Sequence, residues 1–104
     1  RNTLDLINAG KEYTVEIRFM HPASVWISEK LWLPTQKIMW LGDDSIIFKA
    51  RVNGLVDITR WILGYGSLAI VLKPVELADK VRNEIETMGN SYQKEYNDEK
   101  VKNH

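Results

Sequence analysis

The sequence predicts an α+β domain, in which a four-stranded antiparallel sheet carries two helices on one face and a further helix follows at the C-terminal end. Segments 12–19 and 46–52 alternate apolar and polar residues with the period of two that a half-buried strand requires. A Gly-Asp-Asp triplet joins the second segment to an earlier strand-like run, as in a hairpin. Segments 55–63 and 75–88 instead place their apolar residues at helical spacing.

Composition limits the class of protein. The chain has 104 residues, which is the size of one ordinary domain, and 44% of them are hydrophobic. No apolar run approaches the roughly 20 residues of a membrane span, so we expect a soluble protein with no membrane partner. Fourteen basic and fourteen acidic side chains cancel. A neutral chain has no overall field to gather nucleic acid, although a local basic patch can still form.

The absence of cysteine excludes disulfides and thiol chemistry and is consistent with a reducing compartment. We therefore expect a cytoplasmic location. The sequence lacks an initiating methionine and a signal-like segment, so we also expect it to be a piece of a longer protein.

The first half of the chain begins with residues 1–10, which show no sustained period and are interpreted as a linker or the remnant of a preceding domain. The domain itself is placed at residues 11–89 and opens with the strand 12–19. His21-Pro22 ends that strand, and a helix is predicted from Pro22 to about Trp32, with Val25, Trp26, Glu29 and Trp32 at helical spacing.

Two strands of a hairpin come next, at Gln36 to Leu41 and Ser45 to Val52. Asn53-Gly54 then turns the chain into a helix from about Leu55 to Leu63. Alternation in the second strand places Phe48 and its apolar partners on one face, so the register is well specified.

The stretch 61–77, W-I-L-G-Y-G-S-L-A-I-V-L-K-P-V-E-L, fixes the topology of the second half. Gly64 and Gly66 can take the positive φ that a helix stop needs, so the helix containing Trp61 is predicted to end there. A buried strand follows at 67–72.

Pro74 closes the strand and begins a helix that includes Leu77, because the first helical turn needs no amide hydrogen at that position. Gly89 is predicted to stop this helix, whose apolar face comprises Leu77, Ala78, Val81, Ile85 and Met88. Residues 90–104 form a polar tail that we expect to fray.

Strand, helix, strand, strand, helix, strand, helix is thus the predicted order. Right-handed crossovers in the two strand-helix-strand units give a ferredoxin-like βαββαβ sandwich with sheet order 4-1-3-2 and an added C-terminal helix. Both crossover helices then lie on one face, which leaves the other face of the sheet free for a partner or ligand.

Residues capable of catalysis are scarce. His21 and His104 are the only histidines, and without cysteine they do not make a typical closed zinc site. No serine has a nucleophile setting, and Gly64-x-Gly66 precedes a strand, whereas a dinucleotide fingerprint follows one. Asp43 and Asp44 are interpreted as solvated turn formers. We expect neither an enzyme nor a metal or cofactor site.

Three segments together resemble the WCX domain, the C-terminal extension of bacterial WYL-domain transcription regulators. They are V-E-I-R-F in the first strand, the W-I-L-G-Y-G break, and I-V-L-K-P-V-E-L leading into the last helix. The similarity runs from about Tyr13 to Ile85. It implies a regulatory module that helps the protein to form a homodimer and shapes the response of the adjacent WYL domain to a ligand, in some members nucleic acid. DNA binding would belong to the helix-turn-helix domain of the parent protein.

Two other classes share the βαββαβ order. An ACT-like domain that senses small molecules would bind its ligand between paired domains. An acylphosphatase-like enzyme would need an arginine in a phosphate-cradling loop after the first strand, whereas Arg18 lies inside the strand. The enzyme is the weakest of the three alternatives.

The free sheet face carries the candidate ligand contacts Arg18, Lys49 and Arg51, which point the same way if the first and third strands are neighbours. Glu16 lies among them, so one interpretation is a cross-strand charge ladder. The other is an anion or nucleic-acid site completed by the WYL domain, because guanidinium groups bind phosphate in a planar fork.

Apolar residues on the same outer face suggest self-association. Ile47, Val71 and Met20 are predicted to point outward, and a homodimer would bury them about a two-fold axis.

Overall fold

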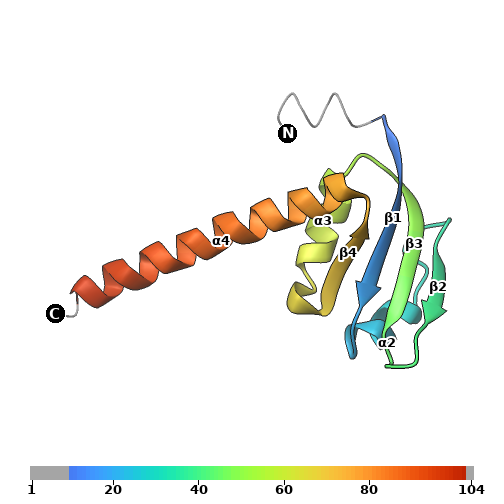
Figure 1. The fold of residues 1–104 in the computed structure, drawn as a ribbon, viewed down its shortest axis with the longest axis horizontal. Coiled ribbons are helices and arrows are strands. Elements are labelled where there is room, and N and C mark those ends of the chain that lie inside the picture. Colours follow the sequence, from blue (N-terminus) through green and yellow to red (C-terminus); the bar gives the residue numbers. More distant parts are fainter. Residues whose placement is uncertain (1–9, 103–104) are drawn as a thin grey trace.

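The computed structural model describes residues 10–102 and confirms an α+β domain with a four-stranded antiparallel sheet and a C-terminal helix (Figure 1). The strands and helices are β1 (Glu12–Phe19), α2 (Ala23–Ser28), β2 (Lys37–Trp40), β3 (Ile46–Asn53), α3 (Val56–Leu63), the short 3-10 turn η1 (Gly66–Leu68), β4 (Ala69–Lys73) and α4 (Val75–Lys102). The proposed linker falls almost entirely on residues 1–9, which lie outside the described part of the chain.

The sheet has the strand order β2-β3-β1-β4, which is 4-1-3-2 when it is counted from the opposite edge. All three pairings are antiparallel, including the predicted hairpin between β2 and β3. The central pair β1 and β3 runs in register from Glu12 opposite Asn53 to Phe19 opposite Ile46. The edge strand β4 is shorter, and its pairing shifts register between Glu16 and Ile17.

The alternation of apolar and polar residues in β1 and β3 predicted correctly which side chains face the core. Val15, Ile17 and Phe19 of β1 are fully buried, as are Ile46 and Phe48 of β3. The helices complete the core with the buried residues Ala23, Ile27, Ile58, Ile62, Leu77 and Val81. Helix α3 and the first turns of α4 pack against each other, and α4 also packs against β4 (Figure 1).

Helix α2 is shorter than predicted, because it ends at Ser28 and not near Trp32. A loop held by the side chain of Gln36 replaces its second half. The Gln36 Oε1 atom accepts a hydrogen bond from the Trp32 amide at 2.7 Å, and its Nε2 atom donates to the Lys30 carbonyl at 2.9 Å. The predicted face is also wrong, since α2 buries Ala23, Ser24 and Ile27 while Val25 and Trp26 are exposed.

The two glycines between α3 and β4 serve different purposes. Gly66 has the expected positive φ of 58°, but Gly64 has a helical φ of −63°. A Cβ atom on Gly64 would lie 3.3 Å from the Trp61 carbonyl oxygen, so the absence of a side chain permits close approach there and not a left-handed turn. The 3-10 turn η1 follows, so β4 begins at Ala69, two residues later than predicted.

Helix α4 starts directly after Pro74, whose carbonyl oxygen accepts hydrogen bonds from the amides of Leu77 and Ala78, both at 3.1 Å. The predicted stop at Gly89 is wrong, because the helix continues to Lys102. The segment expected to fray, 90–104, is therefore helical as far as the structure describes it. Glycine costs only about 1 kcal/mol in a helix interior relative to alanine, which good helix formers on both sides can offset.

Helix α4 leaves the body of the domain and projects into solvent (Figure 1). Within residues 10–102, no helix combines the length and apolar character needed to cross a membrane.

Candidate functional site

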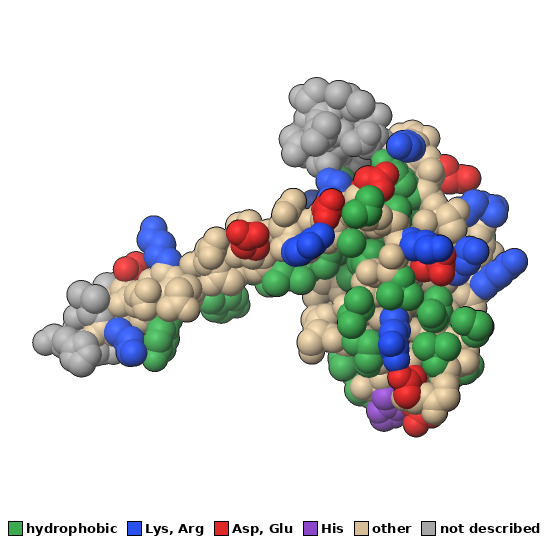
Figure 2. All heavy atoms as spheres, viewed as in Figure 1, with side chains coloured by type: hydrophobic (Ala, Val, Ile, Leu, Met, Phe, Trp, Pro, Cys, Tyr) green, Lys and Arg blue, Asp and Glu red, His purple; other side chains and the backbone are tan. Residues whose placement is uncertain are grey.

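The outer face of the sheet, which α3 and α4 do not cover, is built from cross-strand rows of side chains. One row contains Met39, Ile47, Arg18 and Ile70, in order from β2 to β4. The next row contains Lys37, Lys49, Glu16 and Lys73. The outer face thus divides into an apolar half and a charged half, and Figure 2 shows green hydrophobic side chains below a gathering of blue basic ones.

A hollow of about 250 Å³ lies in the charged half and is lined by Thr14, Thr35, Lys37, Lys49, Ala50 and Arg51. We call the three cations, Lys37, Lys49 and Arg51, the basic cluster. The Thr35 Oγ1 atom accepts a hydrogen bond from the Arg51 amide at 2.9 Å, which joins the loop before β2 to the end of β3. This bond positions one wall of the hollow.

The charges of the basic cluster are only partly compensated. The Arg51 Nε atom lies 3.8 Å from a Glu12 carboxylate oxygen, but both side chains are largely exposed. Glu16 faces Lys49 across the strands, yet its carboxylate pairs with Lys73 at 3.6 Å. No carboxylate within the described part of the chain lies at ion-pair distance from the lysines of the cluster.

Lys37 and Lys49 are directly opposite each other in the β2 and β3 pairing. Like charges in that position destabilise a sheet, typically by a few tenths of a kcal/mol to about 1 kcal/mol. An anion in the hollow would relieve this repulsion. Two ammonium groups and one guanidinium group around a concave surface provide the hydrogen-bond donors that phosphate or carboxylate requires.

Arg18 does not belong to this cluster. Its guanidinium group forms an ion pair with the Asp43 carboxylate, and its Nε atom donates a hydrogen bond to the Ser45 hydroxyl at 3.2 Å. Arg51 is opposite Thr14, four residues along β1 from Arg18, which is a distance of roughly 13 Å along a strand. Lys49 and Arg51 therefore line one hollow, whereas Arg18, a diagonal cross-strand neighbour of Lys49, pairs with Asp43 instead.

Lys37 and Thr35 line the hollow and Asp43 pairs with Arg18, and the sequence alone indicated none of these three contacts. Lys37 alternates with Gln36 and Ile38 in a predicted strand, so pairing the hairpin residue by residue would have placed it beside Lys49. Asp43 had been interpreted only as a turn former, and no local pattern indicates its ion pair with Arg18.

The Asp43 carboxylate accepts hydrogen bonds from the Ser45 hydroxyl and the Ser45 amide, the latter at 3.1 Å. These bonds, together with the Arg18 guanidinium group, lower the pKa of Asp43 below its ordinary value. A carboxyl with a lowered pKa stabilises the fold above the pKa of the unfolded chain, about 4, and that contribution is lost as the pH falls through the folded value.

We accordingly expect the stability difference between the wild-type chain and Asp43→Asn to be largest near neutral pH and to shrink below about pH 4. Urea unfolding at a series of pH values measures this difference. A difference that stays constant between about pH 7 and about pH 3 would show that the Asp43 carboxylate contributes nothing through its charge.

The structural motif predicted from the sequence lies on the opposite side of the domain. Trp61 contacts four aromatic rings, and Leu77 is fully buried under the first turn of α4. Together with Gly64, Gly66 and Pro74 these residues shape the junction between α3, β4 and α4 and provide no group that could bind a ligand through charge.

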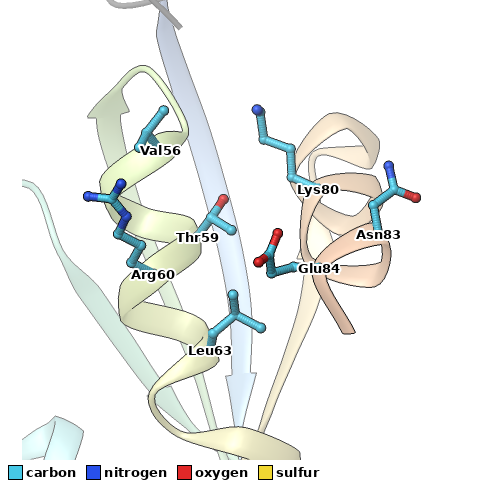
Figure 3. A pocket seen from close by; sticks show the side chains of 7 residues that line it. All are labelled: Val56, Thr59, Arg60, Leu63, Lys80, Asn83 and Glu84. Atoms are coloured by element: carbon cyan, nitrogen blue, oxygen red, sulfur yellow. The ribbon is translucent and has the colours of Figure 1, made fainter. Parts of the chain in front are cut away.

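A second hollow, of about 400 Å³, lies between α3 and α4 (Figure 3). It is lined by Val56, Thr59, Arg60, Leu63, Lys80, Asn83 and Glu84. Figure 3 shows Lys80 and Glu84 on the α4 side and Arg60 on the α3 side. Charges of both signs mix here, so this hollow lacks the single sign of charge that distinguishes the basic cluster.

Metal-binding side chains do not gather anywhere in the part of the chain that the structure describes. A comparison with curated proteins gives no match. The family model of the WCX domain matches residues 11–89, which is more than half of the chain and contains the whole sheet with α2, α3 and the first half of α4. This chain belongs to the WCX domain family.

Proposed function

We propose that the chain is the C-terminal regulatory domain of a bacterial WYL-type transcription regulator, in which the outer sheet face contacts an effector that bears phosphate groups. Family membership supports the first part of the proposal. The four-stranded sheet, one face of which α3 and α4 leave uncovered, supports the second part because that face is available to the WYL domain and its ligand.

The observation that carries the phosphate assignment is the basic cluster. Lys37, Lys49 and Arg51 surround one hollow, and the two lysines have no acidic partner among the described residues. An effector nucleic acid would neutralise them and release counterions. The apolar half of the outer face, with Met39 and Ile70, would pack against the WYL domain of the same parent chain.

In this proposal the domain acts by binding and not by catalysis, and it requires no cofactor. Operator DNA would be bound in the cytoplasm by the helix-turn-helix domain of the parent protein. This architecture requires a helix-turn-helix and a WYL domain to be encoded upstream of Arg1 in the same gene, and reading that gene tests it directly.

The effector contact is tested with a fluorescent single-stranded DNA of about ten nucleotides, within the roughly 4–16 nucleotides that single-strand sites span. Removing one lysine that binds a phosphate should reduce the slope of log K against log salt concentration by about 0.7. We expect Lys49→Gln and Lys37→Gln to reduce the slope by about this amount each and to weaken binding several-fold at low salt.

Lys94→Gln is the matched control, because it removes the same charge from the exposed surface of α4, away from the sheet. Arg18→Gln is a second control, since Arg18 is held by Asp43 and lies outside the basic cluster. Equal slopes for Lys49→Gln and Lys94→Gln would contradict a phosphate site in this hollow. Repeating the comparison in the intact regulator, with effector-dependent operator binding as the readout, tests whether the contact serves regulation.

A further inference from the structure

The sheet ends at β4, which pairs with β1 on one side and with no strand of residues 10–102 on the other. The Gly54 amide donates a hydrogen bond to the Lys11 carbonyl at 2.8 Å, so residues of β1 in step with Lys11 bond with β3. The alternate residues of β1 bond with β4, and the hydrogen bond from the Met20 amide to the Leu68 carbonyl, at 2.8 Å, continues this pattern.

Val71 directs its backbone groups away from the sheet. Predicted to point outward, it instead lies opposite Ile17, and its side chain packs on the core. Because Ile17 is in step with Lys11 and bonds with β3, the N–H and C=O groups of Val71 face the free edge of β4. Among the described residues, no backbone hydrogen bond outside the sheet uses these groups. The neighbouring side chains Ile70 and Leu72 are 51% and 44% exposed, so solvent reaches this edge.

An apolar hollow of about 370 Å³ lies beside the free edge of β4. Ala69 and Ile70 of β4 form one wall, and α3, η1 and α4 form the others. Ser67 is the only lining residue with a polar side chain. The space beside Gly66 is empty, since a Cβ atom there would meet nothing within 4 Å. The edge of β4 thus borders a space that takes apolar groups.

Helix α4 extends over the place where a further strand would lie. Its first turns are on the inner face of the sheet, because Leu77 and Val81 belong to the core. Figure 1 shows α4 crossing the direction of the strands and passing beyond β4 on the side away from β1. Ile85 lies about 6 Å beyond Val81 along the helix axis, and neighbouring strands are about 4.8 Å apart. Ile85 and Met88, 55% and 45% exposed, are therefore positioned to cover a strand added to β4.

We propose that the groove between the free edge of β4 and helix α4, which we call the edge groove, binds an extended peptide segment of a separate protein as a further strand of the sheet. A strand supplies the backbone donors and acceptors that Val71 lacks, at the spacing of a sheet edge. Every second side chain of the segment would enter the apolar hollow and contact Ile85 and Met88. The others would face the outer side of the sheet, so the segment alternates apolar and polar residues.

The choice of a separate protein rests on the proposed function, which assigns the outer sheet face to the WYL domain of the parent chain. Helix α4 overhangs the edge groove from the inner side of the sheet, where Leu77 and Val81 anchor it. A WYL domain on the outer face therefore leaves the edge groove open. An unpaired apolar edge is a template for pairing with another chain, and a partner strand would cover it.

The proposal is tested by fluorescence anisotropy with a labelled peptide of about seven residues, slightly longer than an average strand. Valine and threonine alternate in this peptide, and a lysine at each end keeps it soluble. We expect the 104-residue chain to bind it with a dissociation constant on the order of micromolar. Two N-methylated forms, one methylated on the valines and one on the threonines, keep the side chains and lose the donors of one edge each. Only one form should bind at least about tenfold more weakly, because a strand bonds with β4 through one edge.

Two variants of α4 locate the contact. Ile85→Glu should weaken peptide binding several-fold, because it places a charge against the apolar side of the added strand. Thr87→Glu is the matched control, since it adds the same charge at an exposed position about 200° around the helix from Ile85. It should leave binding unchanged. Both positions are exposed, so neither variant disturbs the core.

Equal binding of all three peptides, no binding below about 1 mM, or equal effects of the two variants would overturn the proposal. Sedimentation equilibrium identifies the alternative occupant. A chain that dimerises without peptide, and loses its dimer in Ile85→Glu, would fill the edge groove with a second copy and would also overturn it. Lys49→Gln should bind the peptide like the wild-type chain, because Lys49 lines the hollow of the basic cluster and not the edge groove. The single-stranded DNA titration can therefore fail while peptide binding holds, and the reverse.

Discussion

Replacing Trp61 by alanine is expected to lower the free energy of unfolding by up to about 3–5 kcal/mol, the usual cost of removing a large aromatic side chain from a core, because the partly buried indole packs against the core. The Trp61 ring lies with its centroid 5.4 Å from those of Phe19 and Trp32 and 5.3 Å from that of Phe48. These contacts join β1, β3 and the loop after α2 to helix α3. Urea unfolding monitored by circular dichroism measures the loss.

The matched variant is Trp61→Phe, because the Trp61 Nε1 atom is buried and donates no hydrogen bond within the described part of the chain. An unsatisfied buried donor costs about 1–3 kcal/mol, and phenylalanine removes that cost while it keeps an aromatic ring in the cluster. We therefore expect Trp61→Phe to be much less destabilising than Trp61→Ala. Equal losses would mean that the indole nitrogen itself is satisfied and stabilising.

The parts of the fold that local periodicity specifies were predictable from the sequence. In β1 and β3 every second residue is apolar, and Val15, Ile17 and Phe48 are buried as that pattern requires. Helix α3 begins within one residue of its predicted start and buries Ile58 and Ile62. In these elements the hydrophobic period agrees with the packing in the folded domain, so the local sequence pattern was enough to predict them.

The predicted ends of α2 and α4 were wrong because helix ends depend on contacts and backbone geometry that the local sequence pattern does not contain. The end of α2 depends on Gln36. Its side-chain amide forms hydrogen bonds with the Trp32 backbone amide and the Lys30 carbonyl, two groups that the predicted helix would have used. Gly89 was interpreted by its type alone, but a glycine stops a helix only where the chain takes a left-handed turn. The residues after it remain in α4.

The candidate site, too, was predictable from the sequence only where strand alternation decides the position of a side chain. The sequence predicted correctly that Lys49 and Arg51 share the outer face, because strand alternation alone places them there. It did not show that Arg18 stays out of the hollow, because that depends on the ion pair between Arg18 and the Asp43 carboxylate in the turn between β2 and β3. Lys37 belongs to the basic cluster because it lies opposite Lys49 in the β2 and β3 pairing, a register that is set only when the hairpin folds.

Leu77→Ala is expected to lower the free energy of unfolding by about 2–5 kcal/mol. Leu77 is fully buried, whereas the next apolar residues on this face of α4 become progressively exposed, from Val81 to Ile85. A cavity under the first turn would therefore remove the principal anchor of α4 on the sheet. Urea unfolding at submicromolar concentration, an on-the-order-of choice well below the dissociation constants of modest interfaces, separates this loss from any dimerisation.

Val75→Ala is the control, because Val75 lies in the same first turn of α4 but is 66% exposed. Its cost should stay within about 0.5 kcal/mol, as for other surface substitutions. The denaturant slope gives a further criterion, since it scales with the surface exposed on unfolding. If α4 detaches in Leu77→Ala while the sheet stays folded, the slope falls along with the stability. If the slope is unchanged, α4 and the sheet still unfold as one cooperative unit. A loss as small as that of Val75→Ala would contradict the anchoring role, and the orientation of α4 would then have to depend on Val81 and the α3 contact alone.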